Sequence, residues 1–293
     1  MKNNVFDIKD LKCKYKSSRN TVLSINNLII KEGDFTFVVG ASGVGKSTFL
    51  ETLGLMTNTI ENGDATFSCL GHDFSDIWSR GETVLSDFRK NNFSFIFQNT
   101  NLFSNLTMLQ NACIRQVLQG ETYNGALLQV KPLFKSILRD VFKDEIYDRN
   151  IAELSGGQRQ RLAFIRAISG NFKILFADEP TGNLDPANAE LIMSALKSQL
   201  KQDQNVNKTV IVVSHDIVNA CKYANRVVLI KKVTDSKDIT QGVIDLDCIY
   251  EKDNFGNWNN MKVNDPLDSD GLFKKLLLTL KEQASQYEVE GIS

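Results

Sequence analysis

A glycine-rich stretch near the start of the chain constrains the fold more than any other feature. It comprises Gly40, Ala41, Ser42, Gly43, Val44, Gly45, Lys46, Ser47 and Thr48. These residues fit the pattern G-x-x-x-x-G-K-[ST], in which backbone N–H groups surround phosphate oxygens, the lysine neutralises β/γ-phosphate charge and the hydroxyl binds Mg²⁺. The apolar run Phe35–Val39 precedes the loop and the helix-permissive run Phe49–Leu53 follows it. An ordinary glycine-rich turn would not require such flanks, so the sequence predicts a strand, a nucleotide-binding loop and a helix.

Composition narrows the possible environments and partners of the chain. Its 293 residues are enough for a large core, and 34 basic against 35 acidic side chains give a formal net charge of −1. We therefore expect no nucleic-acid partner that is attracted by charge. The five cysteines are an odd number without a C-x-x-C pair, which favours a reducing cytosol. The sequence shows no apolar signal core at its start and no run of the roughly 18 apolar residues that a membrane span needs, so a membrane role would require a partner.

Short β-rich runs near the loop predict an antiparallel layer before it. They are Val5–Ile8, Val22–Ile25 and Leu28–Ile30. Tyr15 lies between the first two runs, in a lysine-rich segment. On composition alone Tyr15 is a surface aromatic, and stacking on adenine is the alternative.

Polar side chains follow three further predicted strands. They are Gln98 after the run 93–97, Asp178 and Glu179 after the run 173–177, and His215 after the run 209–214. We expect the two acids to be accessible where a buried parallel strand ends, so Asp178 can hold Mg²⁺ through water and Glu179 can activate an attacking water as general base. His215 ends a buried strand at the same edge. The alternatives are a solvated strand end for the glutamine, a helix cap for the acids and a structural role for the histidine.

A second glycine-containing stretch opens directly into a predicted helix at 159–168. It comprises Leu154, Ser155, Gly156, Gly157 and Gln158. A serine and two glycines at a helix N-terminus form an anion-binding cradle, although a simple N-cap without chemistry explains the stretch equally well in isolation. Helical patterns at Met108–Leu118 and Leu133–Phe142 precede it, and another at Ala187–Leu200 follows.

Taken together, these pieces resemble the ATP-binding-cassette ATPase family over about residues 5 to 230. Six motifs occur in family order: Walker A at 40–48, Gln98, the signature LSGGQ at 154–158, Walker B at 174–178 with Glu179, the D-loop Asn183-Leu184-Asp185, and the switch histidine His215. Tyr15 stands where the family places its adenine-stacking aromatic. The sequence around Gln98 and Asp178 is similar to the ATPases of lipoprotein release, macrolide export and the cell-division pair.

The resemblance implies an α/β fold of the P-loop NTPase class, with a RecA-like, mainly parallel sheet and an antiparallel β subdomain. An α-helical subdomain would be inserted at about 99–168, within an ATPase domain at 1–232. Residues 233–293 would form a C-terminal extension with a return strand, a polar loop at 253–260 and an amphipathic helix at Leu272–Tyr287. We expect the apolar face of that helix to pack on the chain's own core, and docking of a partner or of a second copy is the alternative.

The resemblance also implies a function, namely the ATP-binding and ATP-hydrolysing subunit of a transporter. Two copies would pair head to tail, with each Walker A loop facing the partner copy's signature. Residues implied to contact ATP are Tyr15, the loop Gly40–Thr48, Ser155, Gly156, Gly157, Gln158 and Asp185. Catalytic roles are implied for Glu179, His215, Gln98 and Lys46, and Mg²⁺ would be held by Ser47, Gln98 and Asp178.

A separate integral membrane permease would complete the transporter. The cassette would then lie in the cytoplasm, peripheral on the inner face of the cell membrane. The alternative is a soluble ATPase of the same family that acts on nucleic acid or ribosomes. The near-neutral charge and the presence of one cassette disfavour that alternative.

Overall fold

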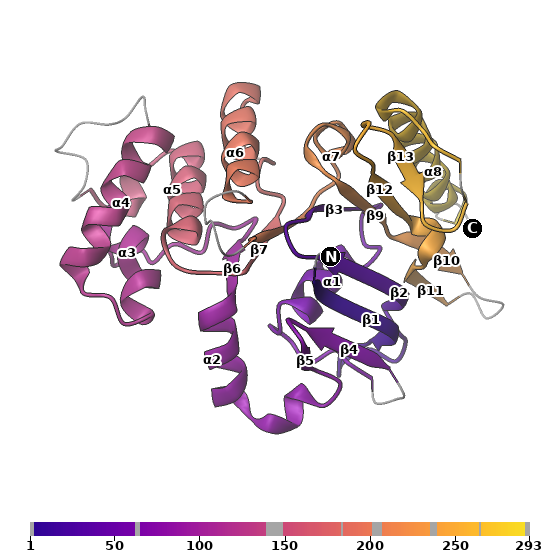
Figure 1. Ribbon diagram of the computed structural model, residues 1–293, viewed down its shortest axis with the longest axis horizontal. Helices are drawn as coiled ribbons and strands as arrows, with labels where there is room; N and C mark the ends of the chain where they lie inside the picture. The colour runs from indigo at the N-terminus through magenta and orange to yellow at the C-terminus, as the bar shows by residue number, and fades with distance from the viewer. Residues whose placement is uncertain are drawn as a thin grey trace. The chain divides into compact units, whose positions relative to one another are not determined.

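The computed structural model describes residues 3–61, 65–138, 149–182, 184–200, 207–234, 239–263 and 265–290. The chain divides into two compact units, a first unit of Met1–Leu85 with Ile211–Ser293 and a second unit of Ser86–Val210 (Figure 1). Residues 62–64, 183 and 201–206 are among those outside the described ranges. No helix in the described ranges combines the length and the apolar character needed to cross a bilayer.

The first unit contains a six-stranded, mainly antiparallel sheet. Its strands, in spatial order, are β10 (Lys231–Thr234), β11 (Thr240–Ile244), β2 (Leu23–Lys31), β1 (Asn4–Cys13), β4 (Thr66–Cys69) and β5 (His72–Asp73). The predicted β layer is therefore present, but the two runs expected at 22–25 and 28–30 form the single strand β2. Asn27 stays in the ladder opposite Lys9, because pairing with β1 outweighs the low strand preference of asparagine.

The first unit also contains strands that lead into the candidate site. The predicted strand Phe35–Val39 is present as β3, and all five of its residues are buried. It pairs in parallel with β9 (Arg226–Leu229), as expected of strands that are covered on both faces. The chain re-enters this unit through β8 (Thr209–Val213), which is followed by α7 (Ile217–Tyr223), while α1 (Lys46–Leu53) follows the glycine-rich loop.

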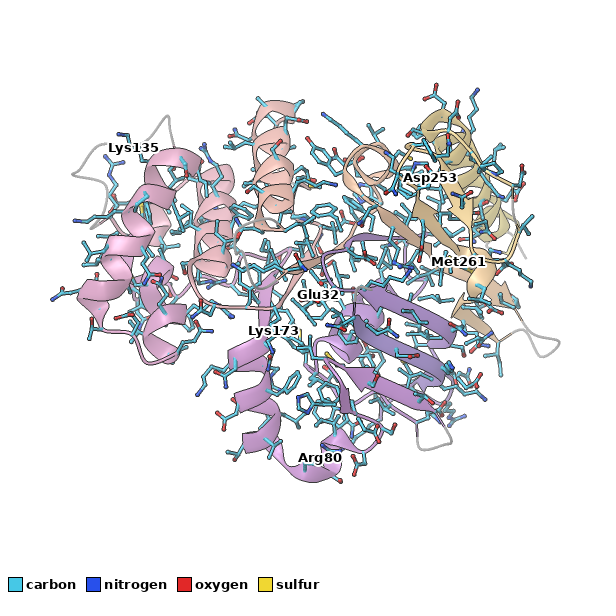
Figure 2. The ribbon with its side chains drawn as sticks, viewed as in Figure 1. Glu32, Arg80, Lys135, Lys173, Asp253 and Met261 are labelled. Atoms are coloured by element: carbon cyan, nitrogen blue, oxygen red, sulfur yellow. The ribbon has the colours of Figure 1, made fainter. Side chains whose placement is uncertain are left out.

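The C-terminal extension is more ordered than the sequence predicted. β12 (Ile249–Lys252) pairs antiparallel with β9, and β13 (Trp258–Asn260) pairs with β12. The prediction of a polar loop over 253–260 is therefore wrong for its last three residues, because the Trp258 side chain is fully buried and draws its strand into the sheet. Asp253 starts the turn that separates these strands, and Met261 follows β13 (Figure 2).

The last helix, α8 (Ser269–Glu290), packs on α7 of the same unit. The predicted apolar face is turned inward, since Leu272 and Leu276 are fully buried. The expectation that this helix packs on the chain's own core is confirmed for these residues.

A buried ion-pair network ties the extension to the central strands. Arg226 of β9 is 3% exposed, and its Nε lies 2.9 Å from Asp34 Oδ2. Its Nη2 contacts the Glu251 carboxylate on β12, which Lys31 also approaches. One arginine therefore connects the residue before β3 with the extension.

The described residues of the second unit include two parallel strands and five α-helices. β6 (Phe93–Ile96) pairs with β7 (Ile174–Asp178), and the stacked rings of Phe95 and Phe176 lie 5.2 Å apart. The helices are α2 (Glu82–Asn92), α3 (Met108–Leu118), α4 (Tyr123–Ile137), α5 (Gly156–Ser169) and α6 (Pro186–Gln199). Helix α3 has the predicted bounds, α2 was not predicted, and α4 begins ten residues before the expected start. The end of the helix predicted at 133–142 lies outside the described residues.

Three short 3₁₀ helices complete the described secondary structure. They are η1 (Ile77–Arg80), η3 (Ile151–Glu153) and η4 (Leu246–Cys248).

Candidate functional site

The glycine-rich loop connects β3 to α1 and carries a lysine that reaches back over it. The Lys46 Nζ donates hydrogen bonds of 2.9 Å to the Gly40 carbonyl and 2.8 Å to the Ala41 carbonyl. Gly45 is the N-cap of α1 with φ 104°, a conformation that side chains with a Cβ rarely adopt. Ser42, Gly43 and Ser47 are exposed, whereas Val44 is buried. The loop therefore presents backbone and hydroxyl groups outward with an ammonium group across it, which suits a phosphate chain.

The return strand β11 supports the loop from the first unit's own interior. Gly242 pairs with Leu23, and its N–H donates to the Val22 carbonyl at 2.9 Å. A Cβ on Gly242 would overlap the Val44 carbonyl oxygen and lie 2.8 Å from Ile230 Cγ2. The glycine therefore lets the β strand approach the backbone of the phosphate-binding loop.

Tyr15 lies against the helix that starts at this loop. Its hydroxyl is 3.1 Å from Thr48 Oγ1 and donates to Glu51 Oε2 at 2.8 Å. Burial, followed by the neighbouring Glu51 carboxylate, raises the pKa of the Tyr15 phenol above its ordinary value, so the hydroxyl remains a donor at neutral pH. The structure thus places Tyr15 beside the Walker A helix. Glu51 was missed by sequence reasoning, although it stands three residues after Thr48 and so shares its helix face.

His215 lies at the same end of the first unit's parallel strands as the loop. The preceding residue, Ser214, donates its N–H to the Val38 carbonyl at 3.1 Å, one residue before β3 ends. His215 is exposed, and Asp216 caps α7 immediately after it by accepting from the Asn219 N–H. The first unit therefore brings the loop, Tyr15 and His215 to one region.

In the second unit, β6 and β7 deliver Gln98 and the two acids to one edge. Ile96 pairs with Ala177, so Gln98 and Glu179 each follow two residues after paired positions. Gln98 is exposed, and Asp178 and Glu179 are half-buried. Glu179 has φ 45°, an unfavourable conformation for a glutamate that functional sites often retain. The Gln160 amide donates to the Pro180 carbonyl at 2.7 Å, which ties α5 to the segment after Glu179.

The signature forms the N-terminus of α5. Ser155 Oγ accepts the Gln158 N–H at 3.2 Å, and Gln158 Oε1 accepts the Ser155 N–H at 2.9 Å, which completes a capping box. Ser155 and Gly156 are exposed, whereas a Cβ on Gly157 would lie 3.5 Å from Leu184. The exposed start of α5 thus offers N–H groups and a hydroxyl to an anion.

Asp185 caps α6 and so has a structural role in this chain. Its carboxylate accepts from the Ala187 and Asn188 N–H groups and from the Asn188 amide. The hydrogen bonds from Asn188 hold the pKa of Asp185 below its usual range. The neighbouring D-loop residue 183 lies outside the described residues.

The chemistry of three predicted ligands fits magnesium. Ser47 offers a hydroxyl, Asp178 a carboxylate and Gln98 an amide oxygen, and Mg²⁺ prefers such oxygen donors, often together with phosphates and water. Among the residues that the structure describes, no group of three or more His, Cys, Asp or Glu side chains forms a metal cage.

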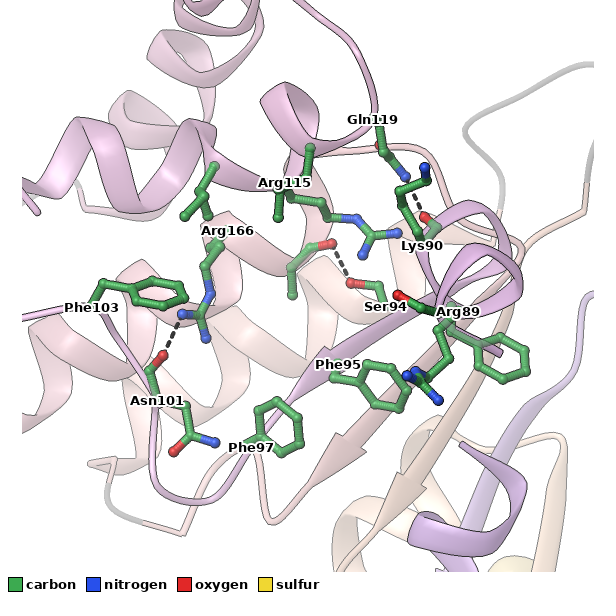
Figure 3. A pocket seen from close by; sticks show the side chains of 15 residues that line it. Arg89, Lys90, Ser94, Phe95, Phe97, Asn101, Phe103, Arg115, Gln119 and Arg166 are labelled. Carbon is green, nitrogen blue, oxygen red and sulfur yellow. Dashed lines mark hydrogen bonds between the residues drawn. The ribbon is translucent and has the colours of Figure 1, made fainter. Parts of the chain in front are cut away.

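The second unit also contains a pocket that sequence reasoning did not identify. Its volume is about 510 Å³, and it lies beside the segment that follows Gln98 (Figure 3). Aromatic rings of Phe95, Phe97 and Phe103 form much of its apolar lining. Its basic lining residues are Arg89, Lys90, Arg115 and Arg166.

Two of these arginines are held only by neutral groups in the described part of the chain. The Arg166 guanidinium donates to the Asn101 carbonyl at 2.6 Å and to the Thr100 carbonyl at 2.7 Å. Arg115 donates to the Asn171 carbonyl at 2.6 Å, and its Nε is buried without a partner among the described residues. Burial lowers the pKa of Arg115 to about 10 and lowers that of Arg166. A guanidinium group binds a carboxylate more strongly than it binds a neutral carbonyl oxygen.

Comparison with known proteins identifies the family to which these features belong. Residues 23–182, more than half of the chain, match the ABC transporter family. The chain belongs to this family. The chain, called the cassette below, is 32% identical over 229 residues to MJ0796 of Methanocaldococcus jannaschii, described as an uncharacterized ABC transporter ATP-binding protein. The aligned region covers 76% of the cassette and 92% of that relative. It is 28% identical over 222 residues to the lipoprotein-releasing system ATP-binding protein LolD of Zymomonas mobilis, over 75% and 90% of the two chains.

A longer relative matches the same region. The cassette is 34% identical over 230 residues to the macrolide export ATP-binding/permease protein MacB of Mannheimia succiniciproducens, over 78% of the cassette but only 33% of MacB. The cassette therefore spans about a third of that relative's length. The macrolide-export and lipoprotein-release relatives confirm the predicted subfamily.

Solved structures confirm the fold class. The dimeric MJ0796 cassette in a post-hydrolysis state, bound to ADP and phosphate, superposes with a TM-score of 0.63 at 28% identity, over 76% of this chain and 93% of that one. Another dimeric MJ0796 structure gives a TM-score of 0.65. The family match and these structures support the prediction that the cassette is an ATP-hydrolysing enzyme.

Proposed function

We propose that two copies of this cassette pair head to tail around ATP and drive a separate membrane permease. The observation that carries the proposal is that the groups suited to bind phosphate lie in two separate segments, the glycine-rich loop and the exposed signature. The loop carries Lys46, and the capped, exposed signature begins α5. In the proposed pair, each signature completes the phosphate site of the other copy, so one copy alone hydrolyses ATP poorly.

The residues predicted to contact the base and the phosphates divide the binding of ATP between them in this proposal. The loop N–H groups and Lys46 hold the β- and γ-phosphates, and the Tyr15 ring stacks on the base. Ser155 and Gly157 donate to the γ-phosphate held by the other copy. Transition-state charge on the phosphoryl oxygens is thereby met by fixed donors, which is the main source of catalysis in phosphoryl transfer.

Hydrolysis itself depends on groups at the ends of the strands. Glu179 accepts a proton from the attacking water. Gln98 and His215 contact the γ-phosphate and the water, and these contacts are lost when the γ-phosphate leaves. Ser47, Asp178 and Gln98 would hold Mg²⁺, which neutralises charge on the phosphate oxygens when it is bound. Loss of the γ-phosphate removes the shared ligand and opens the pair.

The pocket beside Gln98 is the proposed docking site for the permease. Its aromatic lining suits an apolar segment, and the guanidinium groups of Arg115 and Arg166 favour an acidic residue on that segment. Because Arg166 donates to the backbone of Asn101 and Thr100, three and two residues after Gln98, a segment in this pocket can influence the catalytic glutamine. The cassette would then be peripheral on the cytoplasmic face of the membrane.

The decisive experiment uses the Glu179→Gln variant. General-base catalysis contributes about 10²- to 10⁴-fold, so we expect turnover to fall by that factor while ATP binding and ATP-dependent dimerisation persist. Glu190→Gln, at an exposed position on α6, is the matched control and keeps normal turnover. Near-normal turnover of Glu179→Gln would contradict the assignment of Glu179.

The same variant tests the partner. Affinity capture of Glu179→Gln protein from detergent-solubilised native membranes with ATP, followed by mass spectrometry, should recover an integral membrane protein. Arg115→Met should weaken that recovery, whereas Arg80→Met, at an arginine outside the pocket, should not. Recovery of ribosomes or nucleic-acid complexes alone would instead support the soluble alternative.

A further inference from the structure

Tyr15 is held by hydrogen bonds at both its backbone and its hydroxyl. Lys14 donates its N–H to the Thr59 carbonyl at 2.6 Å, and the Tyr15 carbonyl accepts the Ser18 N–H at 2.9 Å. The backbone on either side of the ring is therefore held within the first unit. The remaining freedom of the side chain is its rotation about its own bonds.

Two residues of α1 restrict that rotation. The Tyr15 hydroxyl donates to Glu51 Oε2 at 2.8 Å and lies 3.1 Å from Thr48 Oγ1. Since a phenol has one proton, the bond to Glu51 leaves the Thr48 hydroxyl as donor to the Tyr15 oxygen. Thr48 and Glu51 are three residues apart and so lie on one face of the helix.

The same helix carries the phosphate-binding loop at its N-terminus. Thr48 is 4% exposed and belongs to the first turn of α1, directly after Lys46 and Ser47. The position of the ring is therefore linked to the position of the loop through one short rigid element. A nucleotide that spans both meets a ring already at a fixed place relative to its phosphates.

We propose that Glu51 is a positioning residue for the nucleotide base, because it accepts a hydrogen bond from Tyr15 and holds the ring ready for stacking. This inference rests on the proposed stacking of the base on Tyr15. Glu51 does not contact the phosphates, and its carboxylate acts as a hydrogen-bond acceptor rather than as a charge. Without this acceptor, the Tyr15 side chain would have to be ordered when the nucleotide binds, which corresponds to about a 2- to 10-fold loss of affinity.

The test compares ADP with inorganic pyrophosphate on the full chain by isothermal titration calorimetry. Both ligands occupy the phosphate-binding loop, neither carries a γ-phosphate, and only ADP has a base. The measured quantity is the ratio of the pyrophosphate Kd to the ADP Kd. Loss of the negative charge of Glu51 affects both ligands alike and cancels in this ratio.

We expect the ratio to fall about 2- to 10-fold in Glu51→Ala and in Tyr15→Phe, which keeps the ring but loses both hydroxyl bonds. Glu51→Gln retains an acceptor and should keep the wild-type ratio. An unchanged pyrophosphate Kd, or a tighter one where the charge is lost, shows in each variant that the loop remains folded.

A further variant separates failure of this inference from failure of the proposed function. Tyr15→Ala should lower the ratio by the full stacking contribution, about 5- to 150-fold. If Tyr15→Ala lowers the ratio but Tyr15→Phe and Glu51→Ala do not, the positioning role is overturned and the stacking role stands. If Tyr15→Ala leaves the ratio unchanged, the base does not stack on Tyr15 and both are overturned. A loss in Glu51→Gln equal to that in Glu51→Ala also overturns the acceptor role.

Discussion

Substitution of Gly242 by alanine should damage nucleotide binding from a strand that touches no nucleotide. The added Cβ would overlap the Val44 carbonyl oxygen and lie 2.8 Å from Ile230 Cγ2 and 3.2 Å from Leu23 Cδ1. Ordinary contacts between such atoms are about 3.5–4.0 Å, and overpacking of this kind costs about 1–3 kcal/mol. Because one overlapping atom belongs to the backbone of the phosphate-binding loop, we expect the loop to move.

ADP binding then has to restore the binding-competent conformation of the loop, and the free energy needed for this makes binding weaker. If the whole cost appears in binding, the ADP Kd rises about 5- to 150-fold. Gly71→Ala is the matched control, since φ 78° there imposes strain of about 1–2 kcal/mol but no atom lies within 4 Å of its added Cβ. Calorimetric titration with ADP and urea unfolding measure both effects. An ADP Kd within twofold of wild type for Gly242→Ala, or an equal loss in Gly71→Ala, would refute the reasoning.

Further predictions concern stability, and urea unfolding measures each of them. Arg226→Met should lower the free energy of unfolding by about 3–5 kcal/mol, because it leaves the Asp34 carboxylate buried beside an apolar side chain. Lys231→Met removes the half-exposed ion pair with Asp247 and should change the free energy of unfolding by about 1 kcal/mol or less. Leu272→Ala should lower the free energy of unfolding by about 2–5 kcal/mol, because the leucine is fully buried. Leu278→Ala, at a 61% exposed position of the same helix, should change it by no more than about 0.5 kcal/mol. Burial raises the thiol pKa from 9.0 to about 11 at Cys13, Cys113, Cys221 and Cys248. Their thiols ionise first in the unfolded chain, so stability should be retained below pH 9 and fall as the pH rises from 9 to 11, and a flat profile there would contradict this.

Local sequence signals predicted the secondary structure around the glycine-rich loop, where the motif includes its own flanks. The run Phe35–Val39, the glycines and Lys46 specify a strand, a turn and a helix start within a few residues, and the structure has β3 and α1 there. Helix α3 also has its predicted bounds, since Thr107 and Gln110 form a capping box at its start. The roles assigned to individual site residues stay predictions.

Features that depend on contacts distant in sequence were missed. Residues 258–260 have a polar composition around a tryptophan, and only pairing with β12 and burial of Trp258 make them a strand. The pocket beside Gln98 combines residues of α2, β6, α3 and α5, so no local window contains it. Glu51 acquires its role only because Tyr15, thirty-six residues earlier, reaches the same helix.

The strands of the extension cover an edge of the parallel sheet that would otherwise have unpaired backbone groups. If the chain stopped after β11, the outer N–H and C=O groups of β9 would be unpaired, and such an open strand edge invites pairing with other copies and aggregation. β12 covers that edge, and β13, which ends the sheet, is only three residues long. A shortened protein ending near residue 245 should therefore collect in the insoluble fraction even though every nucleotide motif is intact.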